Sequence, residues 1–144
     1  MKFQSTRSNE KIKYTSAQVI KQGLANDGGL FVPETIPSLT KDDIASFCEL
    51  SYPELAATVL SRFLTDYSFN ELSEDAGNAY SQDSFDGDIC PLKKVDDNTY
   101  SLELWHGPTC AFKDMALQIM PRLLSRALVK TNEEKTAQIG RAHV

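Results

Sequence analysis

The pattern of apolar residues changes at Pro91, and this change constrains the fold more than any other feature of the sequence. Before Pro91, apolar residues recur at the spacing of amphipathic helices. After it, two short β-favouring runs flank the polar turn Asp96–Asn98. We therefore expect a mixed α/β chain, with a helical or mixed N-terminal domain over residues 1–90 and a second unit over residues 91–137.

Side chains that cap helices precede the apolar stripes of the first unit. Thr15 precedes a short helix over 16–24, and Thr40 precedes one that runs to about residue 50. Ser51 begins a capping box with Glu54. The stripe that follows consists of Leu55, Ala56, Val59, Leu60, Phe63 and Leu64. This spacing predicts a helix with one face in the core.

Turn residues punctuate the rest of the first unit. Asn26–Gly29 predicts a turn, and the apolar run Leu30–Val32 that follows is closed by Pro33, which favours an ordered loop or an edge strand. Residues 70–80 predict a weaker helix because it contains Gly77, and a polar loop follows over 81–87.

The second unit begins with a predicted β-hairpin. Its strands lie within 92–95 and 99–104. A helix is expected from residue 112 to about 128, where apolar residues again follow helical spacing. Pro121 requires a kink or a break near 117–120, because proline cannot donate a hydrogen bond to the preceding turn.

Charge and cysteine content exclude several classes of protein. The 144 residues include 15 Lys plus Arg against 20 Asp plus Glu, a formal net charge of -5, which argues against nucleic acid or an anionic membrane as the main partner. No segment approaches the roughly 18 apolar residues of a membrane span, and no signal peptide is recognisable, so we expect a cytoplasmic protein. Cys48, Cys90 and Cys110 are widely spaced, which indicates reduced thiols and no metal site.

The last residues do not resemble the end of a domain. Ile139–Val144 reads IGRAHV, which matches one reading frame of a common sequencing adapter. We therefore expect residues 138–144 to be a non-native tail, in which case His143 carries no chemistry.

The segment from Trp105 to Asp114 joins the predicted hairpin to the next helix, and ligands often bind at such strand–loop–helix junctions. Lys113 falls in the first turn of that helix, where the helix dipole and burial by Phe112 and Met115 would favour its uncharged amine. An uncharged amine is what Schiff-base chemistry requires. By spacing alone, however, most lysines at helix starts are simply solvated.

The segment His106–Asp114, with the sequence HGPTCAFKD, resembles the corresponding segment of the threonine synthase family. Ser5–Arg7, Gly23–Ala25 and Asp27–Pro33 resemble the N-terminal domain of the same family. The resemblance implies that Lys113 is the catalytic lysine that binds pyridoxal 5'-phosphate as a Schiff base. The neighbouring residues expected to shape the site are His106, Gly107, Pro108, Thr109 and Phe112.

The resemblance also implies a reaction and a domain arrangement. The reaction would convert O-phosphohomoserine and water into threonine and phosphate. Residues 91–137 would be the incomplete beginning of a pyridoxal-phosphate-dependent α/β catalytic domain. The family's cofactor-phosphate loop has no counterpart here, so this chain alone is expected to be inactive.

The sequence also leaves open two other functions for the protein and purely structural roles for several residues of this segment. The chain could come from another pyridoxal-phosphate-dependent β-eliminating dehydratase, or residues 1–90 could be a non-catalytic interaction module. His106 is better explained by a structural hydrogen-bonding role, and Cys110 by a small packed thiol. Asp114 is explained by the preference for acids at helix starts, so it is not among the candidate catalytic residues.

Overall fold

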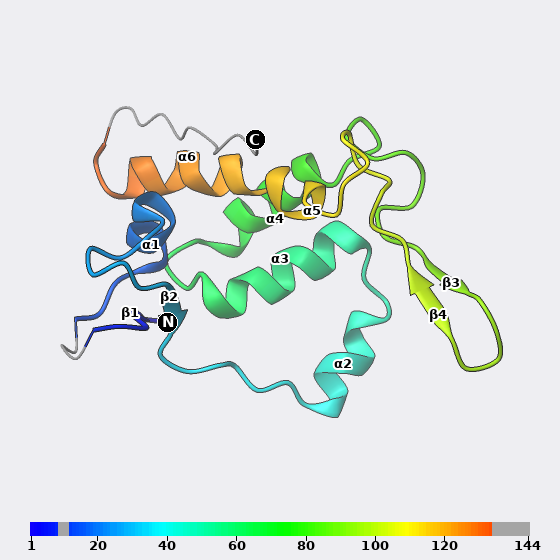
Figure 1. Cartoon of the computed structure of the whole chain (residues 1–144), viewed down its shortest axis with the longest axis horizontal. Coiled ribbons are helices and arrows are strands. Elements are labelled where there is room, and N and C mark those ends of the chain that lie inside the picture. The colour runs from blue at the N-terminus through cyan, green and yellow to red at the C-terminus, as the bar shows by residue number, and fades with distance from the viewer. Residues whose placement is uncertain (9–11, 134–144) are drawn as a thin grey trace.

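The computed structural model describes residues 1–8 and 12–133, so the expected tail at 138–144 lies outside the described residues. Helices and two small sheets alternate along the chain (Figure 1). The helices are α1 (Ser16–Gln22), α2 (Lys41–Phe47), α3 (Tyr52–Phe63), α4 (Phe69–Ala79), α5 (Asp114–Leu117) and α6 (Met120–Lys130). The strands are β1 (Phe3–Ser5), β2 (Phe31–Pro33), β3 (Leu92–Lys94) and β4 (Tyr100–Leu102).

Local capping explains where the first helices begin. Capping boxes at Thr15, Thr40 and Ser51 open α1, α2 and α3, as the sequence predicts. A further box opens α4, where Ser68 accepts a hydrogen bond from the backbone N–H of Glu71. The weaker helix predicted over 70–80 is confirmed, but this capping box was not predicted.

The two sheets are both antiparallel pairs. β3 and β4 form the predicted hairpin, with Leu92 opposite Leu102. Of the two alternatives for the run before Pro33, an ordered loop or an edge strand, the structure shows the strand: β2 pairs with β1, with Phe3 opposite Pro33. β1 was not predicted, because a three-residue strand with a distant partner leaves no periodic signal in the sequence.

The hydrophobic core lies between α1, α3, α4 and α6 (Figure 1). Its buried residues are Ala17, Ala57, Leu64, Tyr67, Leu72, Ala76, Ala79, Tyr80, Phe85, Ile119, Leu123 and Ala127. The last three follow Pro91, so residues from both proposed domains share this cluster. The division at residue 90 therefore stays a prediction.

The break expected before Pro121 is present, since α5 ends at Leu117 and α6 begins at Met120. Two buried tyrosines hold these helices to α3 and α4. The Tyr67 hydroxyl donates to the Leu123 carbonyl at 3.0 Å, and the Tyr80 hydroxyl donates to the Met115 carbonyl at 2.7 Å. Burial raises the pKa of both phenols, so both remain donors at neutral pH.

An arginine on α6 completes the attachment of that helix to α4. Arg126 Nε donates to Asp75 Oδ2 at 2.6 Å, and its Nη2 donates to Glu74 at 2.8 Å. Asp75 is buried, and its hydrogen bonds are the main reason why the pKa of Arg126 is raised. Through α6, the segment that contains Lys113 is fixed relative to the helical core.

Within residues 1–8 and 12–133, no helix combines the length and apolar character needed to cross a membrane. In the same part of the chain, Cys48, Cys90 and Cys110 are all free thiols.

Candidate functional site

The segment Trp105–Lys113 connects β4 to α5 through two consecutive tight turns. In the first, the backbone N–H of Cys110 donates to the Gly107 carbonyl at 3.0 Å. In the second, the N–H of Asp114 donates to the Ala111 carbonyl at 2.9 Å. Cys110 has φ 55°, in the left-handed region that non-glycine residues seldom occupy. The connection is therefore a compact folded loop.

Asp114 lies at the centre of this loop, and none of its surface is exposed. Thr109 donates to it twice, from its backbone N–H to Oδ2 and from its hydroxyl to Oδ1, both at 2.8 Å. Burial acts to raise the pKa of Asp114, but the hydrogen bonds from Thr109 outweigh it, so the pKa is lowered. Asp114 is therefore an ionised carboxylate at neutral pH.

Lys113 precedes α5, and its carbonyl accepts a hydrogen bond from the N–H of Leu117 at 2.8 Å. Its side chain is exposed, and within the described residues no carboxylate forms an ion pair with it. Phe112 is 65% exposed, so the expectation that it buries Lys113 is wrong for this chain. The physical reason is that Asp114 occupies the inward-facing position, which leaves Phe112 and Lys113 facing solvent.

His106 is held on both sides of its ring. Its Nε2 lies 2.9 Å from Glu103 Oε2, and its Nδ1 lies 3.2 Å from the Asp86 carbonyl. The backbone of His106 accepts a further hydrogen bond from the N–H of Asp86 at 2.9 Å, and the Trp105 ring stacks on the imidazole at 5.7 Å. These contacts favour the structural role that the sequence left open. The contacts of Asp86 and Glu103 with His106 were not predicted from the sequence, although Glu103 precedes His106 by only three residues.

A pocket of about 300 Å³ adjoins this histidine. Its walls combine the loop 82–86 with His106, Gly107 and Pro108. The structure therefore brings three of the predicted site-shaping residues to one pocket. Thr109, Phe112 and Lys113 are not among its lining residues. In the described part of the chain, no cluster of His, Cys, Asp and Glu could hold a metal ion.

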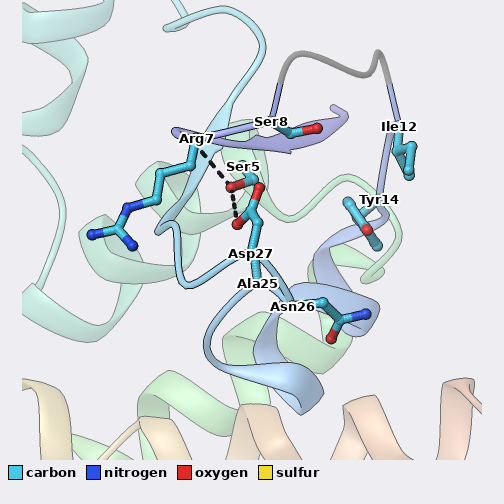
Figure 2. Close-up of a pocket in the computed structure, with 8 residues that line it drawn as sticks. All are labelled: Ser5, Arg7, Ser8, Ile12, Tyr14, Ala25, Asn26 and Asp27. Atoms are coloured by element: carbon cyan, nitrogen blue, oxygen red, sulfur yellow. Dashed lines mark hydrogen bonds between the residues drawn. The ribbon is translucent and has the colours of Figure 1, made fainter.

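A second pocket, of about 440 Å³, lies beside β1 (Figure 2). There the two N-terminal motifs meet: the Ser5 hydroxyl donates to Asp27 Oδ1 at 2.7 Å, and the N–H of Gly29 donates to the same oxygen at 2.8 Å. Gly28 has φ 75°, as the expected tight turn requires. The motifs thus stabilise one another and fix the start of β2.

Fold and loop together define a mixed α/β protein that presents a lysine at a strand–loop–helix junction, a place where such proteins bind small molecules. Residues 2–80 match the family model described as "Threonine synthase N terminus". The chain belongs to the threonine synthase family.

Individual relatives agree with this assignment. The chain is 39% identical over 137 residues to a threonine synthase from Pseudomonas aeruginosa, covering 92% of this chain but 28% of the relative. The crystal structure of pyridoxal-phosphate-bound threonine synthase from Brucella melitensis superimposes with a TM-score of 0.84 at 36% identity, covering 92% of this chain and 28% of that one. The yeast threonine synthase gives a TM-score of 0.82 at 34% identity. The chain thus spans little more than a quarter of the length of these relatives.

Proposed function

We propose that the protein containing this chain is a pyridoxal-phosphate-dependent threonine synthase, in which Lys113 binds the cofactor. The observation that carries the proposal is the presentation of the Lys113 amine at the end of a rigid loop. The chemistry of this residue fits the cofactor, because a lysine amine is the group that forms a Schiff base with an aldehyde. His106, Gly107, Pro108, Thr109 and Phe112 shape the surroundings of that amine.

The proposed reaction converts O-phosphohomoserine and water into threonine and phosphate. When bound, the cofactor supplies an electron sink that makes the Cα proton of the substrate acidic. Lys113 would hold the cofactor through Nζ, and the same amine would be placed to take the Cα proton of the substrate. In the net reaction the γ-phosphate leaves as inorganic phosphate, one hydrogen of Cβ is replaced by the hydroxyl group from water, and Cγ gains the hydrogen that completes the methyl group of threonine. Lys113 thus acts both as an anchor and as a base.

The match over residues 2–80 supports threonine synthase over the dehydratase alternative, because the dehydratases are not expected to contain that N-terminal domain. Domain boundaries at residue 90 and the incomplete catalytic unit at 91–137 belong to the same proposal. So does the inactivity of the chain by itself, since it covers 28% of the Pseudomonas relative.

The test uses the complete open reading frame that contains this chain, expressed with pyridoxal phosphate. Borohydride reduction followed by peptide mass spectrometry should find the cofactor on Lys113, and O-phosphohomoserine should release phosphate. Lys113→Ala should abolish the attachment and lower phosphate release at least about 10²-fold. Lys93→Ala, which removes an exposed lysine from β3, should change neither.

The other outcomes separate the alternatives. Cofactor on Lys113 without phosphate release would assign the protein to another pyridoxal-phosphate-dependent lyase. A folded protein without attached cofactor would favour the remaining alternative, in which residues 1–90 are a non-catalytic interaction module.

A further inference from the structure

We infer that Asp114 is a positioning residue, whose buried carboxylate closes the loop 107–114 and thereby fixes the direction in which Lys113 is presented. This inference rests on the proposed role of Lys113 as the cofactor lysine, and it adds a residue that the sequence analysis excluded.

The hydrogen bonds of Asp114 lead backwards across the loop. Both carboxylate oxygens accept from Thr109, five residues earlier, at 2.8 Å each. A single residue that receives a backbone N–H and a hydroxyl from the same partner locks both the position and the orientation of that partner. Asp114 therefore fixes the distance between Thr109 and Asp114, the two residues that flank the segment containing Lys113.

A simple helix-start preference does not explain this arrangement. A carboxylate that serves the helix dipole is commonly exposed and contacts the first backbone N–H groups of its own helix. Asp114 has no exposed surface, and its carboxylate contacts Thr109 outside α5. With four residues, α5 also has little dipole to complement.

The loop is built around this carboxylate. A Cβ atom at Gly107 would lie 2.5 Å from Asp114 Cβ, so only glycine leaves room for the side chain. Cys110 adopts its left-handed conformation, φ 55°, between the two residues of the bridge. A strained backbone conformation of this kind persists only where the surrounding contacts hold it in place.

Lys113 takes its direction from this bridge. It directly precedes Asp114, so the inward direction of the carboxylate leaves the lysine side chain on the exposed surface. On its other side, α5 is anchored through the Met115 carbonyl, which accepts from Tyr80 at 2.7 Å. The backbone of Lys113 is thus held between two fixed points.

The test compares Asp114→Asn with Thr109→Val and Thr109→Ser in the complete holoenzyme. Asn keeps the shape but turns an NH₂ donor towards one of the Thr109 donors, and Val removes only the hydroxyl. Both should lower kcat about 10- to 10²-fold, with little change in KM for O-phosphohomoserine. Ser keeps both donors and should restore wild-type behaviour. Asp42→Asn, at the exposed first turn of α2, is the matched control.

A second readout does not require activity. In cofactor-free protein, hydrogen exchange at residues 107–113 should accelerate in Asp114→Asn and Thr109→Val but not in Thr109→Ser. If Asp114→Asn fails to fold, Thr109→Val decides, because it preserves the backbone hydrogen bond and the side-chain volume.

The inference is overturned if kcat, cofactor attachment and loop exchange in these variants equal those of wild type. Failure of the proposed function looks different, since wild-type protein would then carry no cofactor on Lys113. In that case the exchange measurement still decides whether Asp114 orders the loop.

Discussion

At the scale of single residues, Gly107 and Gly77 show how the surroundings of a glycine decide what a methyl group would do. A Cβ at Gly107 would meet the buried side chain of Asp114 at 2.5 Å. Gly77 lies in the last turn of α4, and a Cβ there would meet nothing within 4 Å. The first position requires glycine for close approach, whereas the second only weakens a helix.

We therefore predict opposite effects for the two alanine substitutions. Gly107→Ala should lower the free energy of unfolding by about 1–3 kcal/mol, the usual cost of overpacking a filled site. Gly77→Ala should raise it by up to about 0.5 kcal/mol, because alanine loses less backbone entropy than glycine in a helix. Urea denaturation of both variants checks this pair. Equal effects would mean that the approach of Gly107 to Asp114 does not constrain the loop.

At the scale of elements, α2 contains no buried residue, so its stability depends on polar contacts and not on burial in the core. Asp43 caps its first turn, accepting from the backbone N–H of Thr40 at 2.8 Å, and Arg62 on α3 donates to the same carboxylate at 2.5 Å. The hydrogen bonds from Thr40 and then Arg62 lower the pKa of Asp43 from 3.8 to about 2. One ionised carboxylate thus stabilises the start of α2 and links it to α3.

This shift predicts how α2 responds to acid. Because the folded pKa is lowered, the contribution of Asp43 is fully present above about pH 3.8 and is lost as the pH falls through about 2. A carboxyl NMR titration should give that midpoint and a matching change in the shifts of α2. Arg62→Met should raise the midpoint but leave it below 3.8, since Thr40 contributes more than Arg62. A midpoint near 3.8 in wild type would show that the cap does not form.

Helix starts were predictable because their signals are local. Thr15, Thr40 and Ser51 sit within three residues of the groups they cap, and Pro121 marks its own break. β1 was not predictable in this way, because it forms only by pairing with β2, which lies far along the sequence.

In the candidate site, too, features set by neighbouring residues were predictable and features set by contacts with more distant residues were not. The sequence singled out the loop and Lys113, because the identity of neighbouring residues carries that information. The inward direction of Asp114 and the exposure of Phe112 depend on a bridge to Thr109, which local propensity does not encode. The same holds for the contacts of Asp86 and Glu103 with His106, since periodicity describes faces and not individual partners.

At the scale of the whole molecule, a shared core links the loop to the N-terminal helices. Leu123 and Ala127 of α6 pack in the same cluster as Ala17 of α1 and Leu72 of α4. The candidate site lies at the other end of the α5–α6 segment (Figure 1). Unfolding of this core should therefore release the loop as well.

The single tryptophan makes this coupling measurable, because Trp105 stacks on His106 within the loop. We predict that its fluorescence and the helical circular dichroism of the 144-residue chain change together during urea denaturation. Leu123→Ala should shift both transitions equally, with a loss of about 2–5 kcal/mol in the free energy of unfolding. Val129→Ala, on the same helix but 76% exposed, should shift neither appreciably. A fluorescence transition that stays in place while the helical signal moves would show that the loop and the helical core unfold independently.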